Sequence, residues 1–209
     1  RPLILAHGGA GSRRMTPAQS TCLADALAAG YGILVQGGSA LAAVECTIGL
    51  LEQSGLFNAG RGANRQLDGV QRMDAAIMEG GHLQAGAVAS IEGILHPISV
   101  ARLVMEKTDH VLLVGPLAGR FARHFKLDRL RAVGLSRRLS YDRILARQIR
   151  STAERHGTVG AVALDRFGTV AAGASTGGIE SMLPGRVGDT PLIGCGVYAD
   201  NQSGAVSMT

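Results

Sequence analysis

The segment HGTVG at residues 156–160 places a threonine, Thr158, between small residues. If the Gly157–Thr158 bond is broken, Thr158 carries both a side-chain hydroxyl and a free α-amine. The hydroxyl can act as a nucleophile, and the amine, with a pKa near ~8, can serve as its base at neutral pH. The same hydroxyl can attack the preceding carbonyl, and glycine at 157 leaves room for that attack. The segment therefore predicts a chain that cleaves itself and exposes an N-terminal threonine nucleophile.

Two later segments supply groups that such a nucleophile needs. The segment STGG at 175–178 contains Thr176, whose hydroxyl lies beside Thr158 if the flanking strands form a hairpin. In PGRVGD at 184–189, Arg186 can bind a carboxylate and Asp189 an ammonium group, which suits the two charged ends of an amino acid. Simpler interpretations exist: a strand-initiating residue for Thr158, turn chemistry for Thr176, and a surface ion pair for the two charged residues.

Short apolar runs separated by glycine turns are expected to position these groups. Alanine- and leucine-rich segments predict helices, one beginning at Thr16-Pro17 and another capped by Ser39. The expected strands are residues 3–6, 73–78, 84–91, 111–114, 159–165, 170–174, 192–198 and 205–209, and the expected helices are residues 17–36, 40–53, 97–107 and 118–125. Strands and helices both come in pairs, which indicates an α+β fold with an antiparallel sheet rather than alternating βαβ units.

Composition limits the class of protein. With 46% hydrophobic and 18% charged residues, the chain suits one globular domain with a sizeable core. The net charge is +5, and arginines gather between residues 129 and 155. No nucleic-acid motif accompanies this cluster and aromatic residues make up only 3%, so a solvated helix or linker is favoured over a nucleic-acid surface. Three widely spaced cysteines favour a reducing compartment, the cytoplasm, and no apolar run is long enough to span a membrane.

The motifs together resemble one family. The segments HGTVGAVALD, AAGASTGG, LPGRVGDTPLIGCGVYADN and GAVSMT are similar to those of plant-type (type III) L-asparaginases, which are also isoaspartyl peptidases and belong to the N-terminal-nucleophile (Ntn) hydrolases. Upstream, HGGAG, FNAGRG, MDAAIMEG, AGAVASI, HPISVARLVMEKTDHVLLVG and FARHF resemble the same family. The resemblance covers nearly the whole chain except the variable region 129–155.

The resemblance implies a role for six residues. Cleavage is expected between Gly157 and Thr158. The implied roles are nucleophile for Thr158, hydrogen-bond partner of the nucleophile for Thr176, oxyanion-hole donor for Thr209, a place near the nucleophile for Asn58, and binding of the substrate α-carboxylate and α-ammonium for Arg186 and Asp189.

The resemblance also implies an architecture. The expected fold is the four-layer αββα sandwich, with residues 1–157 as the α-subunit, 129–157 as a variable linker before the cleavage site, and 158–209 as the start of a truncated β-subunit. The expected assembly is a homodimer of α/β heterodimers, without a catalytic cofactor, nucleic acid or membrane. A structural sodium ion is implied on the backbone carbonyls of Leu51, Glu52, Ser54, Phe57, Ala59 and Arg61.

The implied activity is hydrolysis of L-asparagine to aspartate and ammonia, and of β-aspartyl (isoaspartyl) peptides. One alternative is a glycosylasparaginase, although that subgroup tends to show STNG where this chain has STGG. A taspase-like threonine hydrolase is a second alternative. The third is an uncleaved, inactive fragment, because the chain stops at Thr209, where the family continues with further glycine donors, helices and strands.

Overall fold

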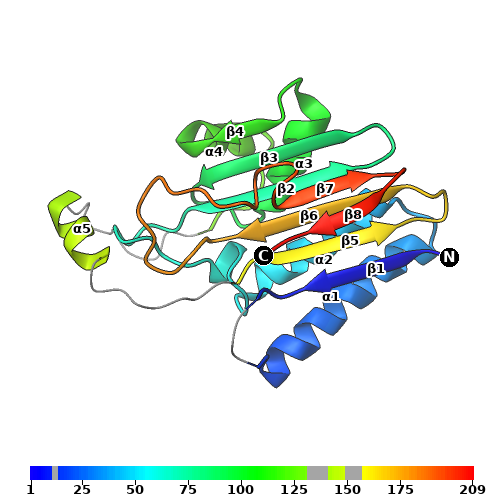
Figure 1. The fold of residues 1–209 in the computed structure, drawn as a ribbon, viewed down its shortest axis with the longest axis horizontal. Coiled ribbons are helices and arrows are strands. Elements are labelled where there is room, and N and C mark those ends of the chain that lie inside the picture. The colour runs from blue at the N-terminus through cyan, green and yellow to red at the C-terminus, as the bar shows by residue number, and fades with distance from the viewer. Residues whose placement is uncertain (11–13, 131–140, 149–156) are drawn as a thin grey trace.

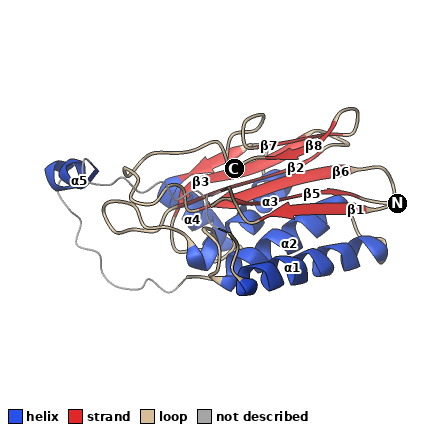
Figure 2. Cartoon of the chain, turned by 60° about the horizontal axis from the view of Figure 1, so that its bottom comes forward, coloured by secondary structure: helices blue, strands red, loops and turns tan. Residues whose placement is uncertain are grey.

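A layer of helices covers one face of a six-stranded sheet, and a two-stranded sheet lies on the other face (Figures 1 and 2). The computed structural model describes residues 1–10, 14–130, 141–148 and 157–209. The strands are β1 (Leu3–His7), β2 (Met73–Glu79), β3 (Gln84–Ile91), β4 (Leu112–Val114), β5 (Val159–Leu164), β6 (Val170–Thr176), β7 (Val197–Asp200) and β8 (Gly204–Ser207). The helices are α1 (Pro17–Val35), α2 (Ala40–Ser54), α3 (Pro97–Lys107), α4 (Gly115–His124) and α5 (Tyr141–Gln148), with a 3₁₀ turn, η1, at Gly60–Gly62.

The large sheet has the strand order β1-β5-β6-β2-β3-β4, so segments far apart in sequence lie side by side. Neighbouring strands are antiparallel except β3 and β4, which are parallel. Strands β5 and β6 form a hairpin at the centre, flanked by β1 from the chain start and β2 from its middle. The second sheet is the hairpin β7–β8, which packs on β5 and β6.

The two long helices begin where their capping residues predict. The Thr16 hydroxyl accepts from the Gln19 amide, and the Gln19 side chain accepts from the Thr16 amide, so α1 starts with a capping box. The Ser39 hydroxyl caps α2 by accepting from the Ala42 amide, and α2 ends at Gly55 in the left-handed conformation. These ends fix α2 beneath β5 and β6.

The central strands of the large sheet are buried on both faces, whereas the edge strands β1 and β4 are partly exposed, and the two cores differ in composition. Along β2, Ala75 and Ile77 face the helices, whereas Ala76 and Met78 face the second sheet. The core between the two sheets is mostly alanine: its buried members are Ala76, Met78, Ala87, Ala172, Ala174, Val197 and Ala199. Small side chains allow the sheets to pack closely, which explains why β5 and β6 lack the apolar–polar alternation of a half-exposed strand.

The predicted α+β fold with a largely antiparallel sheet is confirmed, and each predicted helix is present. The strand predicted over 192–198 is wrong for its first five residues. Residues 192–196 form compact turns instead, in which the amides of Cys195 and Gly196 both donate to the Leu192 carbonyl. Gly194, with a φ of +87°, permits this turn. Most of the arginine-rich segment, residues 131–140 and 149–155, lies outside the described residues.

Candidate active site

The β5–β6 hairpin brings the two predicted hydroxyls together. Val159, the first residue of β5, pairs with Ser175, so Thr158 falls opposite Thr176 at the end of β6. The Thr158 Oγ1 donates to Thr176 Oγ1 at 3.2 Å, and the Gly178 amide donates to the same Thr176 oxygen at 3.0 Å. Both threonines are buried, with exposed fractions of 8% and 3%. The hairpin therefore holds the candidate nucleophile in a water-poor site with its hydroxyl oriented.

The bond expected to break lies between two close neighbours. Gly9, with a φ of +111°, packs so tightly that a Cβ placed on it would lie 2.6 Å from the Gly157 Cα. On another side, a Cβ placed on Gly157 would lie 3.1 Å from the Asn58 Cβ. The glycine turn after β1 and the segment after α2 thus enclose Gly157: a side chain at position 9 would collide with it, and one at position 157 would press on Asn58.

Asn58 connects this site to the glycines that follow β6. Its Nδ2 donates to the Gly178 carbonyl at 2.6 Å, and its backbone carbonyl accepts from the Gly177 amide at 2.9 Å. Its Oδ1 accepts from the Asn64 amide at 2.8 Å. Asn58 and Thr176 therefore share Gly178 as a hydrogen-bond partner, and the role expected of Asn58 stays a prediction.

Thr209 joins the site through the same glycine turn. Its Oγ1 accepts a hydrogen bond of 3.4 Å from the Ala10 amide, next to Gly9. Strand β8 leads to it, and Ser207 on that strand fixes the approach: the Ser207 hydroxyl donates to the Gly173 carbonyl at 2.9 Å and contacts His7 Nε2 at 3.3 Å. The structure gives no direct contact between Thr209 and Thr158, so the expected oxyanion role stays a prediction.

Arg186 and Asp189 lie in the loop after β6, and both side chains are exposed. The Arg186 guanidinium lies beside the backbone of Gly188 and 3.9 Å from the Met182 sulfur, and it points toward Gly178. Within the described part of the chain, neither charge takes part in an ion pair. The simpler interpretation, a mutual surface ion pair, is therefore not what this structure shows, and both side chains lie at the surface where a ligand can reach them.

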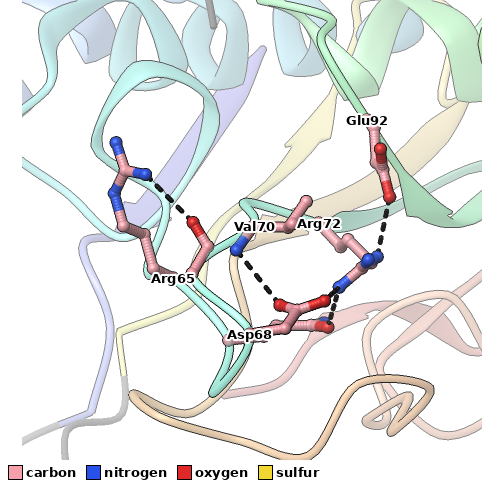
Figure 3. Close-up of polar contacts among 7 residues, drawn as sticks. Arg65, Asp68, Val70, Arg72 and Glu92 are labelled. Carbon is pink, nitrogen blue, oxygen red and sulfur yellow. Dashed lines mark hydrogen bonds and ion pairs between the residues drawn. The ribbon is translucent and has the colours of Figure 1, made fainter. Parts of the chain in front are cut away.

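The hairpin around Leu67, more than a hundred residues earlier in the chain, holds this loop in place. The Leu67 amide donates to the Met182 carbonyl, and the Ser181 amide donates to the Arg65 carbonyl. Figure 3 shows how the hairpin itself is braced: the Arg72 guanidinium lies between Asp68 and Glu92, at 2.8 Å from each carboxylate. A third bond of 2.7 Å runs from Arg72 Nη1 to Gln66 Oε1.

We expect Arg72→Met to destabilise the protein by about 2 kcal/mol, because it leaves the nearly buried Asp68 carboxylate without its cation. Chemical denaturation at neutral pH measures the change. Arg102→Met is the control, because its partners Glu45 and Glu106 are both more exposed than Asp68. A loss under about 1 kcal/mol is expected there. Equal losses in the two variants would contradict a special role for the Arg72 cluster.

Three titratable groups, the half-buried His7 and the buried Glu52 and Asp74, lie around the site, and their roles were not predicted. Burial lowers the pKa of His7, against hydrogen bonds to the backbone of Thr158 and Ser207 that raise it. Burial raises the pKa of Glu52, which accepts from the Ser175 hydroxyl at 2.6 Å and the Ile98 amide at 3.0 Å. Burial also raises the pKa of the third group, Asp74 on β2. A charged residue inside an otherwise apolar strand was the signal available for Asp74.

The lowered pKa of His7 predicts a loss of stability in acid. Below about pH 6.5 the unfolded chain protonates this histidine while the folded chain does not, so stability falls with decreasing pH by up to about 1.4 kcal/mol per pH unit. Subtracting the unfolding free energies of His7→Gln from those of the wild type between pH 5 and 8 isolates this term. His82→Gln, at an 82% exposed side chain, is the control. A difference that does not change with pH would contradict the prediction.

The carbonyls predicted to hold sodium belong to the end of α2 and to the segment that follows it, and the sodium site itself stays a prediction. The 3₁₀ turn folds back on them: a Cβ on Gly60 would lie 2.5 Å from the Glu52 carbonyl oxygen, and one on Gly62 would lie 2.8 Å from that of Gly55. Carbonyls at a helix C-terminus carry partial negative charge, and hard cations prefer oxygen ligands. The Phe57 carbonyl accepts from the Ala59 amide, which leaves it a second lone pair. No trio of His, Cys, Asp or Glu suited to a metal occurs among the residues the structure describes.

The fold and site together define a hydrolase class in which a buried hydroxyl follows a glycine at the start of a central strand. Comparison with known proteins agrees: the chain matches the asparaginase family over residues 1–209, and it belongs to that family. This family has the Ntn-hydrolase fold, so the predicted fold class is confirmed. In the part of the chain that the structure describes, no helix is long and apolar enough to cross a membrane.

Three relatives illustrate the similarity. The chain is 41% identical over 219 residues to "Isoaspartyl peptidase/L-asparaginase" of Danio rerio and 42% identical over 217 residues to the protein of the same name in Homo sapiens. It is 41% identical over 228 residues to "Isoaspartyl peptidase" of Salmonella typhimurium. Each match covers 100% of this chain, and 70%, 70% and 73% of the respective relative.

Proposed function

We propose that this protein is an autocatalytically processed amidohydrolase that acts on L-asparagine and on β-aspartyl peptides. The observation that carries the proposal is the buried contact of 3.2 Å between the Thr158 and Thr176 hydroxyls, directly after a glycine enclosed by Gly9 and Asn58. The two activities named for the relatives support the choice of substrates. The free charges of Arg186 and Asp189 suit the α-carboxylate and α-ammonium that both substrates share.

Processing begins with an attack within the chain. The Thr158 Oγ1 attacks the Gly157 carbonyl carbon, an ester forms as the Gly157–Thr158 C–N bond breaks, and water then hydrolyses the ester. The products are a carboxylate at Gly157 and a free α-amine on Thr158. Cleavage would divide the chain into an α-subunit, 1–157, and the segment 158–209. Of the linker expected over 129–157, residues 131–140 and 149–156 lie outside the described part of the structure.

Turnover then uses the amine that processing has released. The amine takes the proton of the Thr158 hydroxyl as the oxygen attacks the side-chain carbonyl of asparagine or of a β-aspartyl unit. Thr176 hydrogen-bonds the nucleophile, Thr209 donates to the developing oxyanion, and Asn58 lies close by. Ammonia or a peptide amine leaves, a β-aspartyl ester remains on Thr158, and water releases aspartate. These steps use groups of the chain alone, so the proposal includes no catalytic cofactor.

The remaining parts of the proposal concern the setting of the enzyme. We infer a homodimer of cleaved α/β units, by similarity to the family. A sodium ion would be held by the carbonyls of Leu51, Glu52, Ser54, Phe57, Ala59 and Arg61, where it would brace the segment that carries Asn58. All three cysteines are free, which favours a reducing compartment such as the cytoplasm.

Mass spectrometry of the purified protein after incubation at neutral pH tests the proposal. Two fragments are expected, one ending at Gly157 and one beginning at Thr158, together with release of aspartate from both asparagine and a β-aspartyl dipeptide. An intact chain that releases no aspartate would overturn the proposal. Faster release from an N-glycosylated asparagine than from the β-aspartyl dipeptide would favour a glycosylasparaginase, and cleavage of a folded protein would favour a taspase-like enzyme.

A further inference from the structure

A buried carboxylate, Asp74, lies behind the loop that carries Arg186 and Asp189. It sits on β2 directly opposite Thr176 of β6, and only 2% of it is exposed. Its Oδ1 accepts from the Ser90 amide at 2.7 Å. Its Oδ2 is buried, and no donor of the described residues lies within hydrogen-bond distance and angle of it. The Gly188 amide is the nearby backbone donor that acts on this carboxylate. A carboxylate kept in this state costs stability, so packing alone does not account for it.

The sheet register and the loop bring Asp74 and Arg186 into one region. Asp74 lies opposite Thr176. Arg186 Nη1 would lie 3.7 Å from a Cβ on Gly178, two residues after Thr176. The charges that act on Asp74 therefore belong to the substrate-binding loop. The Gly188 amide and the Arg186 guanidinium both act to lower the pKa of Asp74, whereas Asp189 acts to raise it, together with the larger effect of burial. Asp74 therefore attracts the loop at Arg186 and Gly188 and repels it at Asp189. The Arg186 guanidinium itself lies over the backbone of Gly188, whose amide is one of the groups that act on Asp74.

The hydrogen bond to Ser90 explains why a polar side chain stands at position 74, but it does not explain why that side chain carries a charge. An asparagine in its place would accept from the Ser90 amide equally well and would avoid burying a carboxylate. Ser90 has a φ of +53°, so the backbone is held in an uncommon conformation to make this bond. What asparagine could not do is attract Arg186 and repel Asp189.

We propose that Asp74 is a positioning residue that sets Arg186 and Asp189 apart so that they fit the two charged ends of an aspartyl unit. Its carboxylate draws the Arg186 side of the loop inward through the guanidinium and the Gly188 amide, and it directs the Asp189 carboxylate away. This role rests on the proposed function, because it concerns the substrate of that same site. Asp74 does not touch the scissile Gly157–Thr158 bond, so self-cleavage does not depend on its charge.

Asp74→Asn removes the charge and keeps the shape. We expect KM to rise about tenfold for both asparagine and a β-aspartyl dipeptide, with kcat within about threefold of the wild type. The rate of Gly157–Thr158 cleavage is expected to stay unchanged. A general loss of structure would slow this cleavage as well, so the unchanged rate distinguishes the two explanations. Glu79→Gln is the matched control, because it neutralises a carboxylate at the other end of β2 whose partners among the described residues lie in the turn at residues 81–82.

A double-mutant cycle shows whether Asp74 acts through Arg186. In an Arg186→Ala background, Asp74→Asn is expected to change KM by less than about twofold. An unchanged KM in the single variant, or an undiminished effect in the Arg186→Ala background, would overturn the role of Asp74 while leaving the proposed function intact. A wild-type protein that neither cleaves nor releases aspartate would overturn both.

A second measurement is made if the Asp74→Asn variant does not cleave its Gly157–Thr158 bond. Aspartate is then titrated calorimetrically into Thr158→Ala and into Thr158→Ala with Asp74→Asn, since both proteins stay uncleaved. About tenfold weaker binding to the doubly substituted protein is expected. Equal affinities would overturn the proposal.

Discussion

Thr158→Ala is expected to remain a single uncleaved chain and to lose at least about 10⁴-fold of the asparaginase and β-aspartyl peptidase activity. The substitution removes the hydroxyl that attacks Gly157, and without cleavage no α-amine is released to act as base. It also removes the hydrogen bond of 3.2 Å to Thr176, but both positions stay buried in the same hairpin. Electrophoresis of the purified variant and an assay of aspartate release measure the two losses.

Thr158→Ser is the matched comparison because it keeps the hydroxyl and removes only a methyl group. It is expected to cleave more slowly than the wild type and to retain activity within about a hundredfold, since a serine rotates more freely than a β-branched residue. Cleavage of the alanine variant at the same bond would show that another group performs the attack. Full activity of an uncleaved alanine variant would exclude Thr158 as the nucleophile.

Local signals were sufficient to predict most of the fold. Thr16-Pro17 predicts the start of α1 because the hydroxyl satisfies an amide and proline needs no partner there, and the structure adds the reciprocal bond from the Thr16 amide to the Gln19 side chain. The wrong prediction of a strand at 192–196 arose because tertiary packing, and not a local signal, determines the structure there. Apolar residues favoured a strand, but Gly196 lies against the Asp189 carbonyl with no room for a side chain, and this contact is set by tertiary packing.

The candidate site was predictable where hairpin pairing determines it. Once β5 and β6 pair across the turn at 165–168, the antiparallel register places Thr158 opposite Thr176. The position of Arg186 has no such local cause, because the hairpin around Leu67 that holds its loop lies more than a hundred residues earlier. Asp74 was missed for the same reason, since strand β2 reaches the substrate loop only through sheet order.

The glycine turn that follows β1 should be as important for processing as the nucleophile itself. Gly9→Ala is expected to slow Gly157–Thr158 cleavage at least about a hundredfold. The added Cβ would lie 2.6 Å from the Gly157 Cα and 2.9 Å from its carbonyl carbon, so the atom under attack must move. Displacing a reacting group by about 1 Å can cost about 10² in rate. The fraction of cleaved chain over time, followed by mass spectrometry, gives the rate.

Gly93→Ala separates this contact from backbone strain. Gly93 also has a positive φ, +69°, but a Cβ there would meet nothing within 4 Å. Both variants therefore bear the left-handed strain of about 1–2 kcal/mol, and only Gly9→Ala presses on the scissile bond. We expect Gly93→Ala to lower the melting temperature and to cleave at the wild-type rate. If both variants cleave equally slowly, strain rather than contact with Gly157 governs processing, and if both cleave at the wild-type rate, the turn has no part in it.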